Sequence, residues 1–144
     1  MKKLIFFLLF LFITLSLSIP GIKAQSTDPI IIQVNNIRKS YKLASLTESR
    51  QLDISATQKA CDLRDKDYWA HKDPDGKMSW YMFVKAGYYY RFAGENLAKN
   101  CTDLRCVELW MRSPTHRAII LANYKDIGVG RCGIFKVIHL GVKN

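Results

Sequence analysis

The chain has 144 residues, of which 22 are lysine or arginine and 12 are aspartate or glutamate, giving a formal net charge of +10. Its basic residues form no block of the kind that binds nucleic acid, so we expect no nucleic-acid partner. The length that remains after the first 24 residues suits one domain with a single hydrophobic core.

Residues 1–24 have the pattern of a secretory signal peptide. Lys2 and Lys3 precede an almost wholly apolar run over 4–19, and Ala24 ends a passable cleavage site. Because the apolar run is longer than a signal needs, an uncleaved membrane anchor is the alternative, and the remainder is exported in either case. We therefore expect residues 25–144 to form a single secreted domain, extracellular, periplasmic or at the cell surface, and monomeric.

The exported part keeps 19 basic against 12 acidic residues, a charge of +7. This excess favours contact with anionic cell-surface polymers or membranes, or serves solubility alone.

Helical spacing of apolar residues, capping residues and turn formers predict the remaining elements. They indicate an α+β fold with helices on an antiparallel sheet. In chain order they are helices over 29–43 and 48–67, an exposed turn over 71–76, a short helix from Ser79 to Gly87, helices over 103–112 and 114–122, and a hairpin of strands 126–130 and 134–142.

Four cysteines in the exported part predict two disulfides, with three possible connectivities. If Thr102 caps the next helix, Cys101 and Cys106 occupy the two positions that a hydrophobic staple brings together. A bridge between them would leave Cys61 with Cys132. The alternative is that all four are buried as small apolar residues, and none has zinc-finger spacing.

Three ionisable residues stand out by their surroundings: His71 before a Pro-Gly turn, Glu95 in "FAGENLA", and His116 in "SPTHRAIIL". A carboxylate among small apolar residues loses hydration unless partners compensate, and histidines are natural partners. Ser113 can cap the helix that holds His116, with Pro114 at its first position. Each histidine alone has a structural explanation, so any joint site has to be assembled by the fold.

The blocks "YWAHKDPDG", "AGYYYRFAGENLA" and "ELWMRSPTHRAIILANYKDIGVG" resemble the CAP superfamily of secreted domains, also called SCP-like and related to plant pathogenesis-related protein 1. The resemblance covers about residues 30 to 142 and is closest to the bacterial branch, which uses S-P-x-H-R. It implies a three-layer α-β-α sandwich with a small antiparallel sheet. It also implies a cleft lined by His71, Glu95 and His116, with Ser113 at the helix start and Asn96 supporting the turn beneath Glu95.

The chain departs from the family pattern at several positions. Animal members carry a second glutamate where this chain has Ser113, and Glu108 should point to another face of its helix. The usual asparagine after "H-R-A" is Ile119. We expect His139, on the last strand, to be structural.

Two imidazoles and a carboxylate are a reasonable ligand set for a divalent metal, with zinc as the first candidate. The resemblance favours a secreted, non-enzymatic binding module whose cleft takes a metal or a small ligand. The resemblance also implies lipids or sterols as candidate ligands; the aromatic side chains of residues 80–92 would then line a groove, and the alternative is that they pack in the core. A metal-dependent hydrolase of peptides or cell-wall material is the alternative, although no general base can be named. A third hypothesis is a surface that binds anionic polymers through its charge and does not use the cleft.

Overall fold

The computed structural model describes residues 26–144, so the signal peptide expected over 1–24 lies outside the described residues. The elements, in chain order, are α1 (Pro29–Ser40), β1 (Thr47–Glu48), α2 (Arg50–Asp65), α3 (Trp80–Lys85), β2 (Tyr90–Lys99), α4 (Asp103–Arg112), α5 (Pro114–Leu121), β3 (Asp126–Cys132) and β4 (Phe135–Lys143).

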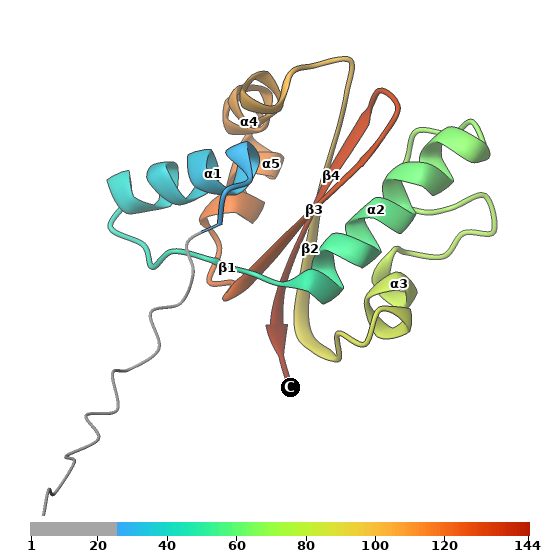
Figure 1. Cartoon of the computed structure of the whole chain (residues 1–144), viewed down its shortest axis with the longest axis horizontal. Coiled ribbons are helices and arrows are strands. Elements are labelled where there is room, and N and C mark those ends of the chain that lie inside the picture. Colours follow the sequence, from blue (N-terminus) through green and yellow to red (C-terminus); the bar gives the residue numbers. More distant parts are fainter. Residues whose placement is uncertain (1–25) are drawn as a thin grey trace, which may run out of the picture.

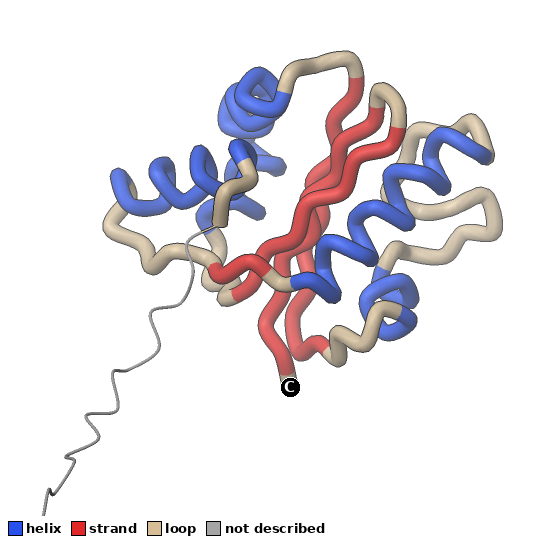
Figure 2. Tube along the Cα trace, viewed as in Figure 1, coloured by secondary structure: helices blue, strands red, loops and turns tan. Residues whose placement is uncertain are grey.

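A four-stranded sheet of order β1-β3-β4-β2 separates two helical layers. Helices α1, α4 and α5 cover one face, and α2 and α3 cover the other (Figures 1 and 2). The three-layer α-β-α architecture expected from the resemblance is confirmed. The sheet is not wholly antiparallel, however, because the short β1 pairs parallel with β3.

The helix boundaries follow from local capping chemistry. The Asp28 side chain accepts from the backbone N–H of Ile30 at 2.9 Å, and Pro29 occupies the first helical position of α1. Thr102 caps α4 as expected, accepting from the backbone N–H of Arg105. Gly87, at φ +79°, ends helix α3 as expected.

Strand β2, which carries Glu95, was not predicted from the sequence. Apart from Leu97, its residues 93–98 are small or polar, and they lack the alternation that marks a half-buried strand. They are covered on both faces, so both odd- and even-numbered side chains from Gly94 to Ala98 are buried although β2 is an edge strand.

Helix α2 lies directly against β3, at two positions that only glycine allows. A Cβ on Gly128 would lie 2.2 Å from the backbone carbon of Leu52, and one on Gly130 would lie 2.0 Å from that of Ala56. Backbone contact this close fixes the position of α2 over the sheet.

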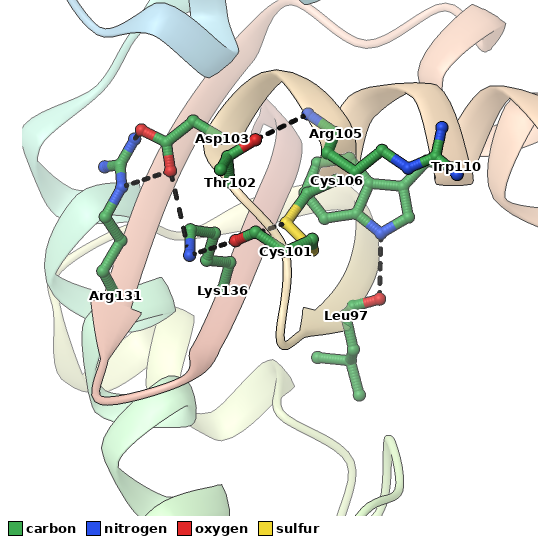
Figure 3. Close-up of a disulfide and its surroundings, with 9 residues drawn as sticks. All are labelled: Leu97, Cys101, Thr102, Asp103, Arg105, Cys106, Trp110, Arg131 and Lys136. Carbon is green, nitrogen blue, oxygen red and sulfur yellow. Dashed lines mark hydrogen bonds and ion pairs between the residues drawn. A yellow bond between two sulfur atoms is a disulfide. The ribbon is translucent and has the colours of Figure 1, made fainter.

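The two disulfides join Cys61 to Cys132 and Cys101 to Cys106, which confirms the pairing inferred from the Thr102 cap. The first links α2 to the end of β3, and the second closes the turn before α4 (Figure 3). In the next turns of α4, the Trp110 indole N–H donates to the Leu97 carbonyl at 2.9 Å and so ties α4 to the edge strand β2.

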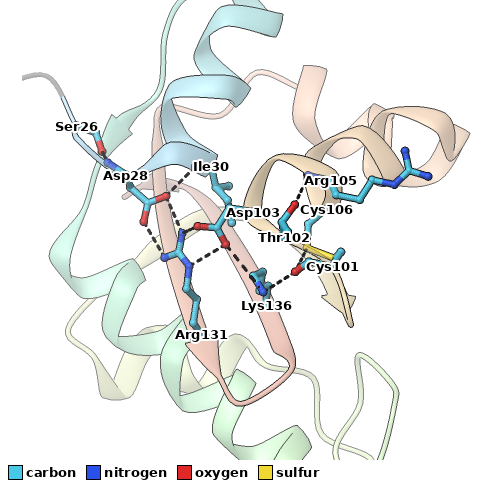
Figure 4. A network of polar contacts seen from close by, with 10 residues as sticks. All are labelled: Ser26, Asp28, Ile30, Cys101, Thr102, Asp103, Arg105, Cys106, Arg131 and Lys136. Carbon is cyan, nitrogen blue, oxygen red and sulfur yellow. Dashed lines mark hydrogen bonds and ion pairs between the residues drawn. A yellow bond between two sulfur atoms is a disulfide. The ribbon is translucent and has the colours of Figure 1, made fainter.

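Arg131 on β3 holds the starts of two helices together. Its guanidinium donates to both carboxylate oxygens of Asp28 at 2.8 and 3.0 Å, and to both of Asp103 at 3.2 and 2.8 Å (Figure 4). Asp28 caps α1 and Asp103 begins α4, so this ion-pair network fixes the layer that also contains α5. Within residues 26–144, none of the helices combines the length and apolar character needed to cross a bilayer.

Candidate functional site

The carboxylate of Glu95 is the centre of a hydrogen-bonded cluster between β2 and the α2–α3 layer. Its Oε1 accepts from His71 Nδ1 at 2.7 Å. Its Oε2 accepts from the Ser79 hydroxyl at 2.5 Å and from His139 Nε2 at 2.9 Å. The side chain of Glu95 is 1% exposed, whereas that of His71 is 47% exposed, so the cluster reaches the surface at His71.

The hydrogen bonds decide the charge state of this cluster. Burial alone would raise the pKa of Glu95, but the hydrogen bonds from His139, His71 and Ser79 outweigh it and lower the pKa to about 2. An ionised carboxylate only accepts, so His71 must carry a proton on Nδ1 and His139 on Nε2. Neutral His71 therefore has its free lone pair on Nε2.

His139 belongs to this cluster, although the sequence suggested only a structural histidine. It is fully buried and stacks on Phe83 with ring centroids 4.4 Å apart. Burial lowers the pKa of His139 even though Glu95 opposes this, so the ring is neutral and its Nδ1 accepts from the Ser55 hydroxyl at 2.8 Å. The order Ser55–His139–Glu95 is that of an activated serine, but Ser55 is fully buried and cannot meet a substrate.

A buried lysine holds the segment that carries His71. The ammonium of Lys59, on α2, donates to the Tyr68 hydroxyl and to the carbonyls of Ala70 and His71, each at 2.9 Å. Lys59 is fully buried, and this burial lowers its pKa. The sequence carried a signal for it, since Lys59 lies beside the apolar stripe of its helix. The Ser79 hydroxyl lies 3.3 Å from the His71 carbonyl, which is a second restraint on the segment.

His116 lies in the opposite helical layer, on α5. It lies in the first turns of α5, where its carbonyl accepts from the Asn96 amide at 3.0 Å. No side chain or backbone group in residues 26–144 hydrogen bonds to its ring. Burial, and then the charge of His71, lower the pKa of His116, which keeps its imidazole neutral near pH 7.

Asn96 and Ser113 take other positions than the sequence suggested. Asn96 follows Glu95 on an extended strand, so it points to the opposite face and supports α5 instead of the turn beneath Glu95. Ser113 is the N-cap residue of α5, but its hydroxyl contacts Thr115 Oγ1 at 3.1 Å and makes no capping bond. The expected side-chain cap is therefore wrong. Glu108 pairs with Arg105 on the exposed side of α4, in line with its exclusion from the site.

The expected metal ligands are not gathered into a three-residue group. In the part of the chain that the structure describes, no three His, Cys, Asp or Glu side chains are placed to hold a metal ion. The reason at Glu95 is chemical, because both of its oxygens already accept hydrogen bonds. Of the aromatic residues of 80–92, which the sequence left as either groove lining or core, Phe83 and Tyr88 are core, because they are fully buried against Leu52.

Comparison with known proteins defines the class. Residues 31–133 match the sequence model of the Cysteine-rich secretory protein family, CAP, and the chain belongs to this family. It is 34% identical over 115 residues to the protein YkwD of Bacillus subtilis, an alignment that covers 78% of this chain and 45% of YkwD.

Two solved structures share the fold. An extracellular protein from Bacillus anthracis that contains an SCP domain matches with a TM-score of 0.76 and 24% identity, over 79% of this chain and 39% of that one. An outer surface protein of Borrelia burgdorferi matches with a TM-score of 0.74 and 21% identity, over 80% and 90% of the two chains. This chain thus spans less than half the length of YkwD and of the Bacillus anthracis protein.

Proposed function

We propose that this CAP domain is an exported binding module in which His71 and His116 bind a divalent metal ion, with zinc as the first candidate. The observation that carries the proposal is the hydrogen bond from His71 Nδ1 to the buried Glu95 carboxylate, at 2.7 Å. Metal-binding histidines commonly donate their other ring N–H to a carboxylate, which fixes the tautomer and makes the free nitrogen more basic. Glu95 would then act on the metal through His71 and not as a ligand.

The donors fit zinc in kind, since neutral imidazole nitrogen is one of its usual ligands. Only two protein donors, the two imidazoles, are proposed, because both carboxylate oxygens of Glu95 already accept hydrogen bonds. Water would complete the coordination, and the affinity would be below that of a structural site with four protein ligands. When bound, the ion would supply a Lewis-acidic position for a ligand with an oxygen or nitrogen donor. The residues of this chain would hold it: Lys59 and Ser79 fix the His71 segment, and Asn96 fixes the start of α5.

Binding is proposed in preference to catalysis because Ser55, Ser79 and His139, which complete the hydrogen-bonded cluster around Glu95 beside His71, are all buried. Export is supported by the two disulfides and by the extracellular and outer-surface descriptions of the structural relatives.

The test is a calorimetric zinc titration of residues 25–144, which contain every described element and both disulfides. We expect one ion per chain, with binding lost in His71→Ala and in His116→Ala. Glu95→Gln should weaken it roughly 10- to 100-fold. Asp75→Ala, in the exposed turn next to His71, is the matched control and should bind as the parent does. Absence of binding in the parent, or parent-like binding in either histidine variant, would overturn the proposal and direct the search to organic ligands.

A further inference from the structure

The segment from the end of α3 into β2 exposes apolar side chains that the core does not use. Val84 is 46% exposed, Tyr89 64% and Phe92 55%, whereas Tyr88 between them is fully buried. We call the exposed side chains of Val84, Lys85, Tyr89, Arg91 and Phe92 the 84–92 patch. Its three apolar members face solvent within nine consecutive residues of the chain.

The exposure is built into a fixed backbone. The N–H of Tyr88 donates to the Phe83 carbonyl at 2.8 Å and that of Gly87 donates to the Val84 carbonyl at 3.0 Å, which closes the turn after α3. The N–H of Asn144 donates to the Tyr89 carbonyl at 3.2 Å. The end of α3, the start of β2 and the end of β4 accordingly lie at one end of the molecule (Figure 1).

The charges at this end are mainly cationic. Lys85 and Arg91 lie in the segment, and Lys143 lies opposite Tyr90 across the sheet. Between residues 76 and 102 the only acid is Glu95, which is buried and held by hydrogen bonds from its own cluster. Asp126 is also at this end of the sheet, and its carboxylate accepts from the Tyr88 hydroxyl at 2.7 Å.

We propose that the 84–92 patch docks on the surface of a bilayer that contains anionic lipids. Aromatic side chains with one apolar and one polar end are favoured at the boundary between headgroups and acyl chains. Lysine and arginine beside them are attracted to anionic headgroups by about 1 kcal/mol each, which corresponds to about fivefold in affinity per cation. A soluble polyanion would engage the cations alone and would leave Val84, Tyr89 and Phe92 unexplained. A lipid surface accounts for both kinds of side chain.

The test is co-sedimentation of residues 25–144 with vesicles of phosphatidylcholine, with and without phosphatidylglycerol. We expect binding to the anionic vesicles only, weakened at high salt. Lys85→Gln and Arg91→Gln should each reduce the affinity about fivefold. Tyr89→Ser with Phe92→Ser should reduce it at least as much, at unchanged charge. Leu104→Ser, at a 53% exposed position on α4, and Lys39→Gln on α1 are matched controls that should bind as the parent does.

Several results would overturn the proposal. These are the absence of binding to either vesicle, equal binding to neutral and anionic vesicles, and parent-like binding of the Tyr89→Ser, Phe92→Ser variant. The last result, together with full competition by soluble polyphosphate, would indicate a polymer-binding surface. Light scattering of the free protein would show whether the patch joins two copies of the chain instead. A dimer that becomes a monomer in the Tyr89→Ser, Phe92→Ser variant would also contradict docking on lipid.

Discussion

His139 Nε2 donates to Glu95 Oε2 at 2.9 Å, which places a fully buried imidazole from β4 behind the carboxylate that orients His71 on the other side. Because a hydrogen bond to a buried charge is costly to lose, the position of His71 at the surface depends on a residue that no ligand can reach.

The stability of the domain should therefore depend on His139 and much less on His116. His139→Ala removes a donor to a buried carboxylate and leaves a cavity, so we expect a loss of about 3 kcal/mol or more in the free energy of unfolding. His139→Gln retains a donor and should recover part of this loss. His116→Ala should cost less than about 1 kcal/mol. Urea unfolding of the three variants measures these values, and equal losses for His139→Ala and His116→Ala would contradict the assignment.

Acid should destabilise the fold in two stages. The pKa values of His139 and His116 are lowered in the folded chain, so below their ordinary value of 6.5 the unfolded chain binds protons more readily. The pKa of Glu95 is about 2 in place of 4.5, so its contribution is present above 4.5 and is lost as the pH falls toward 2. This contribution is about 3 kcal/mol. Urea midpoints measured from pH 7 to 3 should fall, and Glu95→Gln should flatten the part below 4.5. An equally steep fall in that variant would contradict the role given to Glu95.

Close packing of α2 on β3 should make Gly130 intolerant of any side chain. Its Cβ would lie 2.0 Å from backbone, which cannot move without shifting the helix, so Gly130→Ala should cost more than about 3 kcal/mol or prevent folding. Gly76→Ala is the comparison: at φ +79° its Cβ meets open space, so the cost is only the backbone strain of about 1 kcal/mol. Thermal unfolding of the two variants should separate them clearly, and similar midpoints would argue against direct helix-on-strand contact.

The two disulfides should contribute unequally. The Cys61–Cys132 bridge spans 71 positions and the Cys101–Cys106 bridge spans 5. Loop-closure entropy predicts losses of about 4 and about 2 kcal/mol when each pair is replaced by alanine. Denaturant unfolding of the paired variants checks this order, and the reverse order would mean that the short bridge acts mainly on the folded state.

Sequence periodicity was sufficient for the elements whose information is local. The helices and the β3–β4 hairpin follow from apolar spacing, caps and turn residues, and the Thr102 cap led to the Cys101–Cys106 pairing. It failed for β2, where residues that look like a loop form a strand by pairing with β4, as Glu95 does with His139, 44 positions later in the chain. A strand whose faces are decided by distant elements leaves no local pattern.

The candidate site also has a part that local sequence predicted and a part that depends on distant residues. His71, Glu95 and His116 were singled out by their surroundings, and the fold brings His71 into direct contact with Glu95. The role of Glu95 as a buried acceptor, however, depends on His139, which is 44 positions away and reaches it only through strand register. Lys59 could have been suspected from its place in an apolar stripe, but its three acceptors lie in an irregular segment that no pattern predicts.

In the proposed site, Glu95 fixes the tautomer of His71 and leaves Nε2 free for a ligand that His116 shares. A nitrogen–proton correlation spectrum of the chain labelled with ¹⁵N-histidine tests this directly, before and after addition of zinc. We expect neutral His71 to carry its proton on Nδ1, and we expect zinc to shift the Nε2 signals of His71 and His116 while His139 stays unchanged. A proton on Nε2 of neutral His71, or zinc that shifts the signals of neither His71 nor His116, would contradict this arrangement.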